Sequence, residues 1–174
     1  MDIVFNDLEK DTKQSQFITD EVIDLLNFRI NQEELSSRIY HGMSLWLNNN
    51  AYLSTAKVWQ KFADEEMGHA QLAKDYLMSF NIVPKLQSIR EVSTEFGGLR
   101  DVIQKTFDHE VLVTEQCLAL TKKAFELQDF TLFALGQKYN EIQRVEMDES
   151  YSLLDLCKLT HDDLILDKYI SENF

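Results

Sequence analysis

The residues of this sequence that are best suited to chemistry are four glutamates, each of which interrupts the apolar stripe of a different predicted helix. They are Glu33, Glu66, Glu110 and Glu146. Two further polar residues share a helix face with these glutamates, because residues three apart in a helix point the same way: His69 follows Glu66, and Gln143 precedes Glu146. The pattern predicts a polar layer at one level of a helical bundle, with carboxylates from four helices facing one another.

Such a layer requires positive charge. An unpaired carboxylate in a helical core is costly, or becomes neutral through a shift of its pKa. The stripes carry no lysine or arginine that is expected to face inward at this level. Four carboxylates contribute about −4 at neutral pH and two ferrous ions contribute about +4, so two such ions would balance the layer. Carboxylate oxygens with one imidazole nitrogen suit iron or manganese better than a metal that prefers thiolates. We therefore expect a site for two divalent ions, iron or manganese; a non-haem di-iron site is the form that the charge balance above describes.

Each of these residues also has an ordinary structural interpretation. A glutamate on a helix usually faces solvent, and an error of one residue in the helical phase would move a neighbouring glutamate into the layer. The competing residues are Glu34, Glu65 and Glu149. His69 taken alone is as well explained by a structural histidine. The agreement of four separate stripes favours a joint site.

The helices that must position these side chains have core positions spaced alternately by three and four residues, as packing in a bundle requires. Two are predicted over residues 19–48 and 55–79, separated by a break at 48–50. The third begins at 99 and ends before a break at 128–129, the fourth follows this break with core positions over 139–157, and a short fifth helix is predicted over 162–172. Residues 80–98 show no period. A connection of this length is expected where a long crossover joins the two hairpins of a four-helix bundle. The predicted fold class is therefore all-α: two antiparallel hairpins plus a short C-terminal helix.

Composition agrees with one helical domain. The chain has 174 residues, one proline and five glycines, which favours long helices over many turns. An apolar content of 44% argues against disorder, although the net charge is −13. This acidity makes nucleic acids and anionic membranes poor partners, and it attracts cations. The sequence shows neither a signal-peptide pattern nor a long apolar run, so a cytoplasmic location is expected.

The termini of the predicted domain and its two cysteines need separate comment. Residues 1–18 are polar and irregular and are predicted to form an N-terminal extension, so the bundle domain is placed at 19–174. Cys117 and Cys157 have no spacing typical of a metal site or of a disulfide framework. Cys117 falls on the apolar stripe of the third helix, where a small core residue is expected.

Four segments together carry a resemblance to a known family. They are the run from Asn31 to Tyr40, the run from Asp64 to His69, the pair His109-Glu110, and Gln143-x-x-Glu146. These segments resemble the ferroxidase motifs of the non-haem bacterial ferritins, and the resemblance extends from Glu21 to the C-terminus. A single E-x-x-H combined with Q-x-x-E is typical of ferritins, whereas bacterioferritins and rubrerythrins carry E-x-x-H on two helices.

The resemblance implies a role for each residue of the predicted layer. Glu33, Glu66 and His69 would bind the first iron, with Glu66 bridging. Glu110 and Glu146 would bind the second iron, with Gln143 nearby. Tyr40 matches the tyrosine that lies beside the centre in the family, where it would donate an electron or a hydrogen bond; as an alternative, Tyr40 is simply a core aromatic residue.

The resemblance also implies an activity and an assembly. The chain would be a ferroxidase that oxidises Fe(II) with O2 or H2O2 and stores ferric iron in the cavity of a cage. The cage would contain twenty-four copies of the subunit, with the fifth helix near the four-fold axes.

Several positions depart from the family pattern. Ile142 and Val145 stand where bacterial relatives often have glutamates of a third iron site, so a third site is not expected by this route. Phe133 and Gly136 occupy places near the acidic three-fold channel of animal ferritins. Residues 159–163 replace a glycine-rich turn before the fifth helix. His109 should point about 100° away from Glu110, toward another surface.

Two other functions remain open at this stage. A rubrerythrin-like peroxide scavenger would share the bundle, but it would normally carry a second E-x-x-H and a four-cysteine iron site, and this chain has two cysteines. A metal-free helical scaffold would leave four core glutamates without compensating charge. A hydrolase finds no support, because no serine or cysteine stands with a plausible base and orienting acid.

Overall fold

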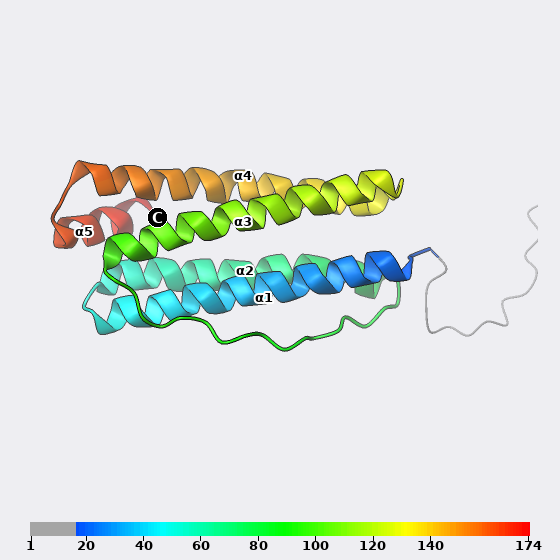
Figure 1. Ribbon diagram of the computed structural model, residues 1–174, viewed down its shortest axis with the longest axis horizontal. Helices are drawn as coiled ribbons and strands as arrows, with labels where there is room; N and C mark the ends of the chain where they lie inside the picture. Colours follow the sequence, from blue (N-terminus) through cyan, green and yellow to red (C-terminus); the bar gives the residue numbers. More distant parts are fainter. Residues whose placement is uncertain (1–16) are drawn as a thin grey trace, which may run out of the picture.

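The computed structural model describes residues 17–174, and this part of the chain is built from five helices. They are α1 (Asp20–Asn49), α2 (Leu53–Ser79), α3 (Leu99–Glu126), α4 (Phe130–Leu159) and α5 (Asp163–Asn173). Figure 1 shows two hairpins side by side, α1 with α2 and α3 with α4, and α5 at one end of the bundle. The predicted all-α fold class, a four-helix bundle with a short C-terminal helix, is confirmed.

The helix ends follow from local chemistry. Thr19 accepts a hydrogen bond from Val22 N at 3.3 Å and caps α1, and Asp129 accepts one from Leu132 N at 2.9 Å and caps α4. The two hairpin turns contain Ala51 and Gln128 with φ of 66° and 55°, a left-handed conformation that ends the preceding helix. These caps and turns make each pair of helices antiparallel.

The crossover of residues 80–98 runs along the bundle on the side of α1 (Figure 1). Asn27 Oδ1, on α1, accepts a hydrogen bond from Lys85 N at 2.8 Å, and Asn31 Nδ2 donates one to Ser88 O at 3.3 Å. At Gly42 the crossover comes so close that a Cβ would lie 2.9 Å from Ser93 O. The long aperiodic segment is therefore fixed by α1 along its length, as the crossover of this bundle type requires.

The apolar core is divided into two clusters along the bundle axis. The first includes Leu47, Trp59, Leu99 and Leu153, and the second includes Leu26, Leu77, Leu120 and Leu132. In all four long helices the predicted glutamates lie between the residues of the two clusters. The bundle thus places one polar layer between two apolar clusters of the core.

The two ends of the described chain are also tied to the bundle. Ile18 is buried within the second cluster, and residues 1–16, which make up most of the predicted extension, lie outside the described residues. Leu166 and Ile170 of α5 are fully buried in the first cluster, and Thr55 N donates to Asp167 Oδ1 at 2.9 Å. None of the five helices is both long enough and apolar enough to cross a membrane within the described part of the chain.

Candidate metal centre

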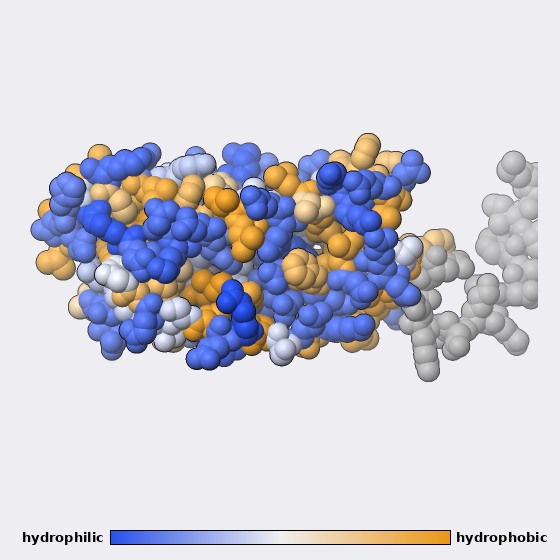
Figure 2. All heavy atoms as spheres, viewed as in Figure 1, coloured by the Kyte–Doolittle hydropathy of each residue, from blue (hydrophilic) through white to orange (hydrophobic). Residues whose placement is uncertain are grey.

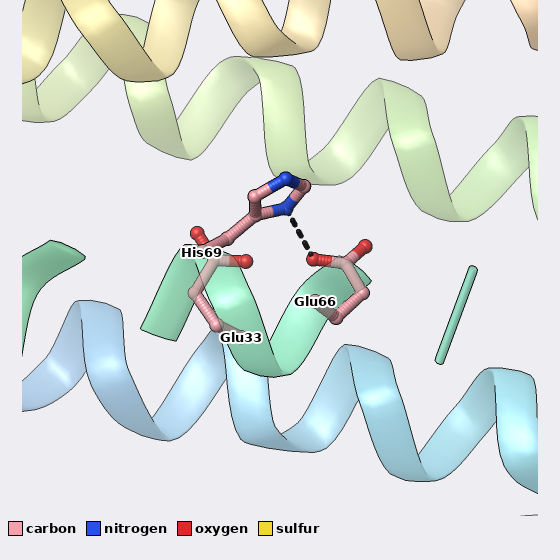
Figure 3. Close-up of side chains that lie close together, drawn as sticks. All are labelled: Glu33, Glu66 and His69. Carbon is pink, nitrogen blue, oxygen red and sulfur yellow. Dashed lines mark hydrogen bonds and ion pairs between the residues drawn. The ribbon is translucent and has the colours of Figure 1, made fainter. Parts of the chain in front are cut away.

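Three side chains from the first hairpin converge at the polar layer. Glu33 lies on α1, and Glu66 and His69 lie one turn apart on α2. Their side chains lie together, and the imidazole of His69 is directed toward the second hairpin (Figure 3). One ligand atom from each lies within 4.8 Å of the others. His69 Nδ1 is 3.0 Å from Glu66 Oε2, and both carboxylates are 2% exposed. This is the spacing that a shared cation requires.

The second hairpin supplies the other half of the layer. Glu110 lies on α3 and is buried. Glu146 lies on α4, and its Oε1 is 3.3 Å from Nδ1 of His69, which connects the two hairpins. Gln143 Nε2 donates hydrogen bonds to Glu110 at 3.1 Å and to Glu146. The structure therefore brings all four predicted glutamates, His69 and Gln143 into one connected cluster.

The amide of Gln143 has a defined orientation. Thr114 Oγ1 donates to Gln143 Oε1 at 2.8 Å, which turns the nitrogen of the amide toward the two carboxylates. An amide nitrogen donates hydrogen bonds and does not bind a metal. In this arrangement Gln143 orients Glu110 and Glu146 from beside the centre.

Tyr40 combines both roles that the sequence left open. It is buried, and its ring lies edge-on to Phe62 with the ring centroids 6.0 Å apart, as for a core aromatic residue. Its hydroxyl also donates a hydrogen bond to Glu110. Burial and the negative charge of Glu110 raise the pKa of Tyr40 well above its usual value, so the phenol keeps its proton and acts as a donor.

The carboxylates of the layer cannot all be ionised without added positive charge. Burial, followed by Glu33 and the other two glutamates, raises the pKa of Glu66 well above its usual value. Burial also raises the pKa of Glu110, and it raises that of Glu146 to about 9. Burial lowers the pKa of His69, which leaves the imidazole neutral and able to bind a metal. A divalent cation would counteract the raised pKa of each glutamate, because its charge favours the ionised carboxylate.

One positive group lies inside the layer, and the prediction that none would face inward is wrong. Arg29, one turn before Glu33 on α1, is 2% exposed, and its Nε lies 2.8 Å from Glu33 Oε1. The sequence did contain a signal. The steps from Leu26 to Arg29 and from Arg29 to Glu33 are three and four residues, so Arg29 fits the stripe as well as Ile30 does.

Arg29 pairs with only one of the two carboxylate oxygens of Glu33, namely Oε1. Among the described residues, no hydrogen-bond donor reaches Glu33 Oε2, although this oxygen is buried. A buried carboxylate oxygen without a partner is costly, and here it belongs to the three residues that converge. Carboxylate oxygens and a neutral imidazole are the donor set that ferrous iron or manganese prefers, so the residues present fit such an ion.

The structure also decides between the predicted glutamates and their neighbours. Glu34 forms an ion pair with Lys74 at 2.5 Å instead of joining the layer. Glu65 is exposed and forms an ion pair with Lys61 at 3.7 Å. Glu149 is partly buried at the edge of the layer. Together with Glu65, it lines a cavity of about 20 Å³ that reaches Glu66 and Glu146, room for one water-sized particle.

His109 does not join the carboxylates, as its expected direction implied. Its Nε2 lies 2.8 Å from Ser36 Oγ, and its ring meets the ring of Tyr40 edge-on at 5.6 Å. Burial, with Arg29 and Arg90 adding repulsion, lowers the pKa of His109 to about 4, so it packs as a neutral ring. Ser36 and Thr114 were not identified from the sequence, because small hydroxyl residues on a helix have no distinguishing pattern.

Comparison with known proteins agrees with this geometry. Residues 23–160 match the profile of the ferritin-like domain. A bacterial non-heme ferritin-like protein of Haemophilus influenzae is 32% identical over 146 residues, which cover 84% of this chain and 88% of the relative. A bacterial non-heme ferritin of Escherichia coli is 31% identical over 139 residues, covering 80% and 84%.

Solved structures support the fold in particular. The open pore ferritin of Archaeoglobus fulgidus superposes with a TM-score of 0.84 over 88% of this chain and 98% of that one, at 24% identity. An engineered closed form of the same ferritin superposes with a TM-score of 0.85 over 88% of this chain and 96% of the other.

Proposed function

Because this chain belongs to the ferritin family, we propose that it oxidises Fe(II) at the centre described above and stores the ferric product inside an oligomeric cage. One observation carries the ferroxidase proposal. Glutamates from all four long helices meet at one level together with a neutral histidine, and a buried oxygen of Glu33 has no hydrogen-bond partner among the described residues. A polar layer with only a structural role would be expected to pair this buried oxygen, and it would not explain why several glutamates with raised pKa values are buried together.

Iron is the substrate here, and the residues have separate tasks toward it. Glu33 and His69 bind one ferrous ion, Glu110 and Glu146 bind the other, and Glu66 lies where it can bridge them. Gln143 and Tyr40 hold Glu110 and Glu146 by hydrogen bonds. The protein thus supplies anionic ligands that favour the ferric state over the ferrous state and a fixed separation of the ions.

The oxidation balances with a two-electron oxidant. Each of two ferrous ions gives up one electron, and O2 takes up both electrons and two protons to form H2O2. Alternatively, H2O2 takes up two electrons and two protons to form two molecules of water. Tyr40 is a buried phenol in direct contact with Glu110, and its hydrogen bond holds this carboxylate in place during the oxidation.

Passage between the centre and the surface is proposed to follow the acidic cavity between α2 and α4. Glu65 and Glu149 line this cavity next to Glu66 and Glu146. Carboxylates along a narrow path attract ferrous ions by their charge.

The surface supports assembly with further subunits. Figure 2 shows hydrophobic residues scattered between hydrophilic ones on the face in view. Large apolar side chains that are at least half exposed occur on several elements: Phe28, Leu86, Leu118, Phe125, Phe130 and Leu164. In the proposed assembly, contacts with neighbouring subunits would cover some of these side chains. We infer a homo-oligomer, with a cage of twenty-four subunits as in the family.

The test is aerobic oxidation of Fe(II), followed by the absorbance of the ferric product, with Glu66→Ala beside the parent. The parent should oxidise about two irons per subunit rapidly, because the centre holds two. The variant should lose this phase while its assembly, measured by gel filtration, stays intact. Glu115→Ala removes an exposed glutamate of α3 and should behave as the parent. Oxidation at the rate of the buffer in the parent, or equal rates in parent and Glu66→Ala, would refute the assignment.

A further inference from the structure

Arg29 is held in the polar layer from several sides. Its Nη1 donates to Gln116 Oε1 at 3.2 Å and lies 3.6 Å from Cys117 Sγ, both on α3. Its guanidinium carbon lies 5.8 Å from the ring centroid of Tyr139 on α4, within the range of a cation–π contact. With Glu33 as its ion-pair partner, the group is fixed beside the centre by three helices. A guanidinium keeps its charge at every pH at which the protein is folded.

This positive charge changes the charge balance of the centre. Once all four carboxylates are ionised, they and the guanidinium sum to about −3, so a single divalent ion leaves about −1 and a second raises the total to about +1. The first ion is attracted by a net negative site, whereas the second enters a site that is close to neutral. Binding of the two ions is therefore expected to be unequal.

The position of Arg29 indicates which ion is disfavoured. The guanidinium lies 2.8 Å from the Glu33 carboxylate, so an ion bound by Glu33, Glu66 and His69 would be its close neighbour. In the described part of the chain, the contacts found for Glu110 and Glu146 are with neutral groups, namely Tyr40, Gln143 and His69. The charge of Arg29 also lowers the pKa of Glu110, but less than the hydrogen bonds of that carboxylate do. Repulsion between two close cations is strong where water is excluded.

We propose that Arg29 is a positioning residue that acts as a built-in counter-cation of the centre and weakens divalent-ion binding at the Glu33 position. This inference rests on the function proposed above. As a result, the ion at Glu110 and Glu146 binds first, and the ion at Glu33 binds weakly and exchanges readily. The ion pair with the guanidinium also keeps the Glu33 carboxylate oriented when that ion is absent.

The experiment is calorimetric titration of the assembled, metal-free protein with Zn2+, a divalent probe that is not oxidised. The parent should show one tight and one weaker step per subunit. Arg29→Gln and Arg29→Met both remove the charge, and each should tighten the weaker step by about tenfold or more. Arg29→Lys keeps the charge and should leave that step weak. Arg144→Gln removes an exposed arginine of α4 and should change neither step.

The outcomes separate this inference from the proposed function. Equal steps in the parent, or a weaker step that both neutral variants leave unchanged or loosen, would overturn the role of Arg29 while the metal centre stands. Absence of Zn2+ binding in the parent and all variants would overturn both. Two neutral variants are used so that a folding defect of one, seen by circular dichroism and gel filtration, does not remove the test. Glu33→Gln should abolish the weaker step and spare the tight one.

Discussion

Neutralising Glu146 should stabilise the metal-free protein, although it removes a residue of the centre. Burial, with Glu110 and Glu33 adding repulsion, raises the pKa of Glu146 from 4.5 to about 9. In the unfolded chain the same carboxyl has an ordinary pKa, so folding at neutral pH forces it to take up a proton. Glu146→Gln replaces the carboxyl by a neutral group of the same size and removes this cost.

The magnitude follows from the size of the shift. Each pKa unit corresponds to about 1.4 kcal/mol, and pH 7 lies about 2.5 units above the ordinary pKa, which gives an upper limit of about 3.5 kcal/mol for Glu146→Gln at pH 7. For a chain of this size, that corresponds to a rise in melting temperature of about 7 to 14 °C. Relaxation of Glu66 and Glu110, which share the layer, reduces the value.

The sign of this predicted difference in stability can be checked by varying the pH. An acid whose folded-state pKa is raised contributes full stability below its unfolded pKa and loses that contribution as pH rises toward its folded pKa. The parent and Glu146→Gln should therefore be equally stable near pH 4.5. The variant should gain by up to about 1.4 kcal/mol for each pH unit up to about pH 9.

The assay is urea unfolding of chelator-treated protein at several pH values and one protomer concentration. Glu141→Gln, on the same helix and paired with Arg144 at the surface, is the matched control and should change little. Saturating Zn2+ should then stabilise the parent more than Glu146→Gln, because the variant has lost a ligand. A variant that is less stable than the parent at pH 8 without metal, or a difference that does not depend on pH, would refute the electrostatic reasoning.

Two further predictions concern the packing that positions the centre. Gly136→Ala should destabilise the protein by about 1 to 3 kcal/mol, because the added Cβ would lie 2.5 Å from Thr121 Oγ1 and 3.1 Å from its Cα on the facing helix. Gly68→Ala, with nothing within 4 Å, should stabilise α2 by about 1 kcal/mol; thermal unfolding that ranks the two in the opposite order would contradict this account. Asn27→Ala should cost about 1 to 3 kcal/mol by removing the acceptor for Lys85 N, and faster hydrogen exchange at that amide would show it, whereas unchanged exchange would mean that the crossover is held elsewhere.

The sequence predicted the helices and the polar layer well, because both depend on periodicity along one helix. Glu33, Glu66, Glu110 and Glu146 each stand on the stripe that also buries apolar residues, and that stripe determines which side faces the core. The break at residues 48–50 and the aperiodic segment 80–98 likewise depend on local composition. These features could be predicted without knowledge of any contact between helices.

Contacts between helices were not predictable in the same way. The orientation of the Gln143 amide depends on Thr114 from another helix, and the place of His109 depends on Ser36. The path of the crossover depends on Asn27, whose side chain is buried although asparagine is usually exposed. Each of these is a polar contact between segments far apart in the chain, and no spacing within one segment specifies it.

Arg29 shows why the charge of the centre must be counted from the folded structure, because the predicted core positions did not include this buried residue. A balance of four carboxylates against two divalent ions is complete without it, and the same balance with Arg29 has an excess of about one positive charge. The buried guanidinium is nevertheless retained beside Glu33, where it contacts α3 and α4 as well. A centre designed only to hold two ions tightly would gain from a neutral residue at this position. A centre that must release one ion after each turnover gains from a permanent cation beside one of its two positions, because the bound ion there is opposed by a charge that does not titrate.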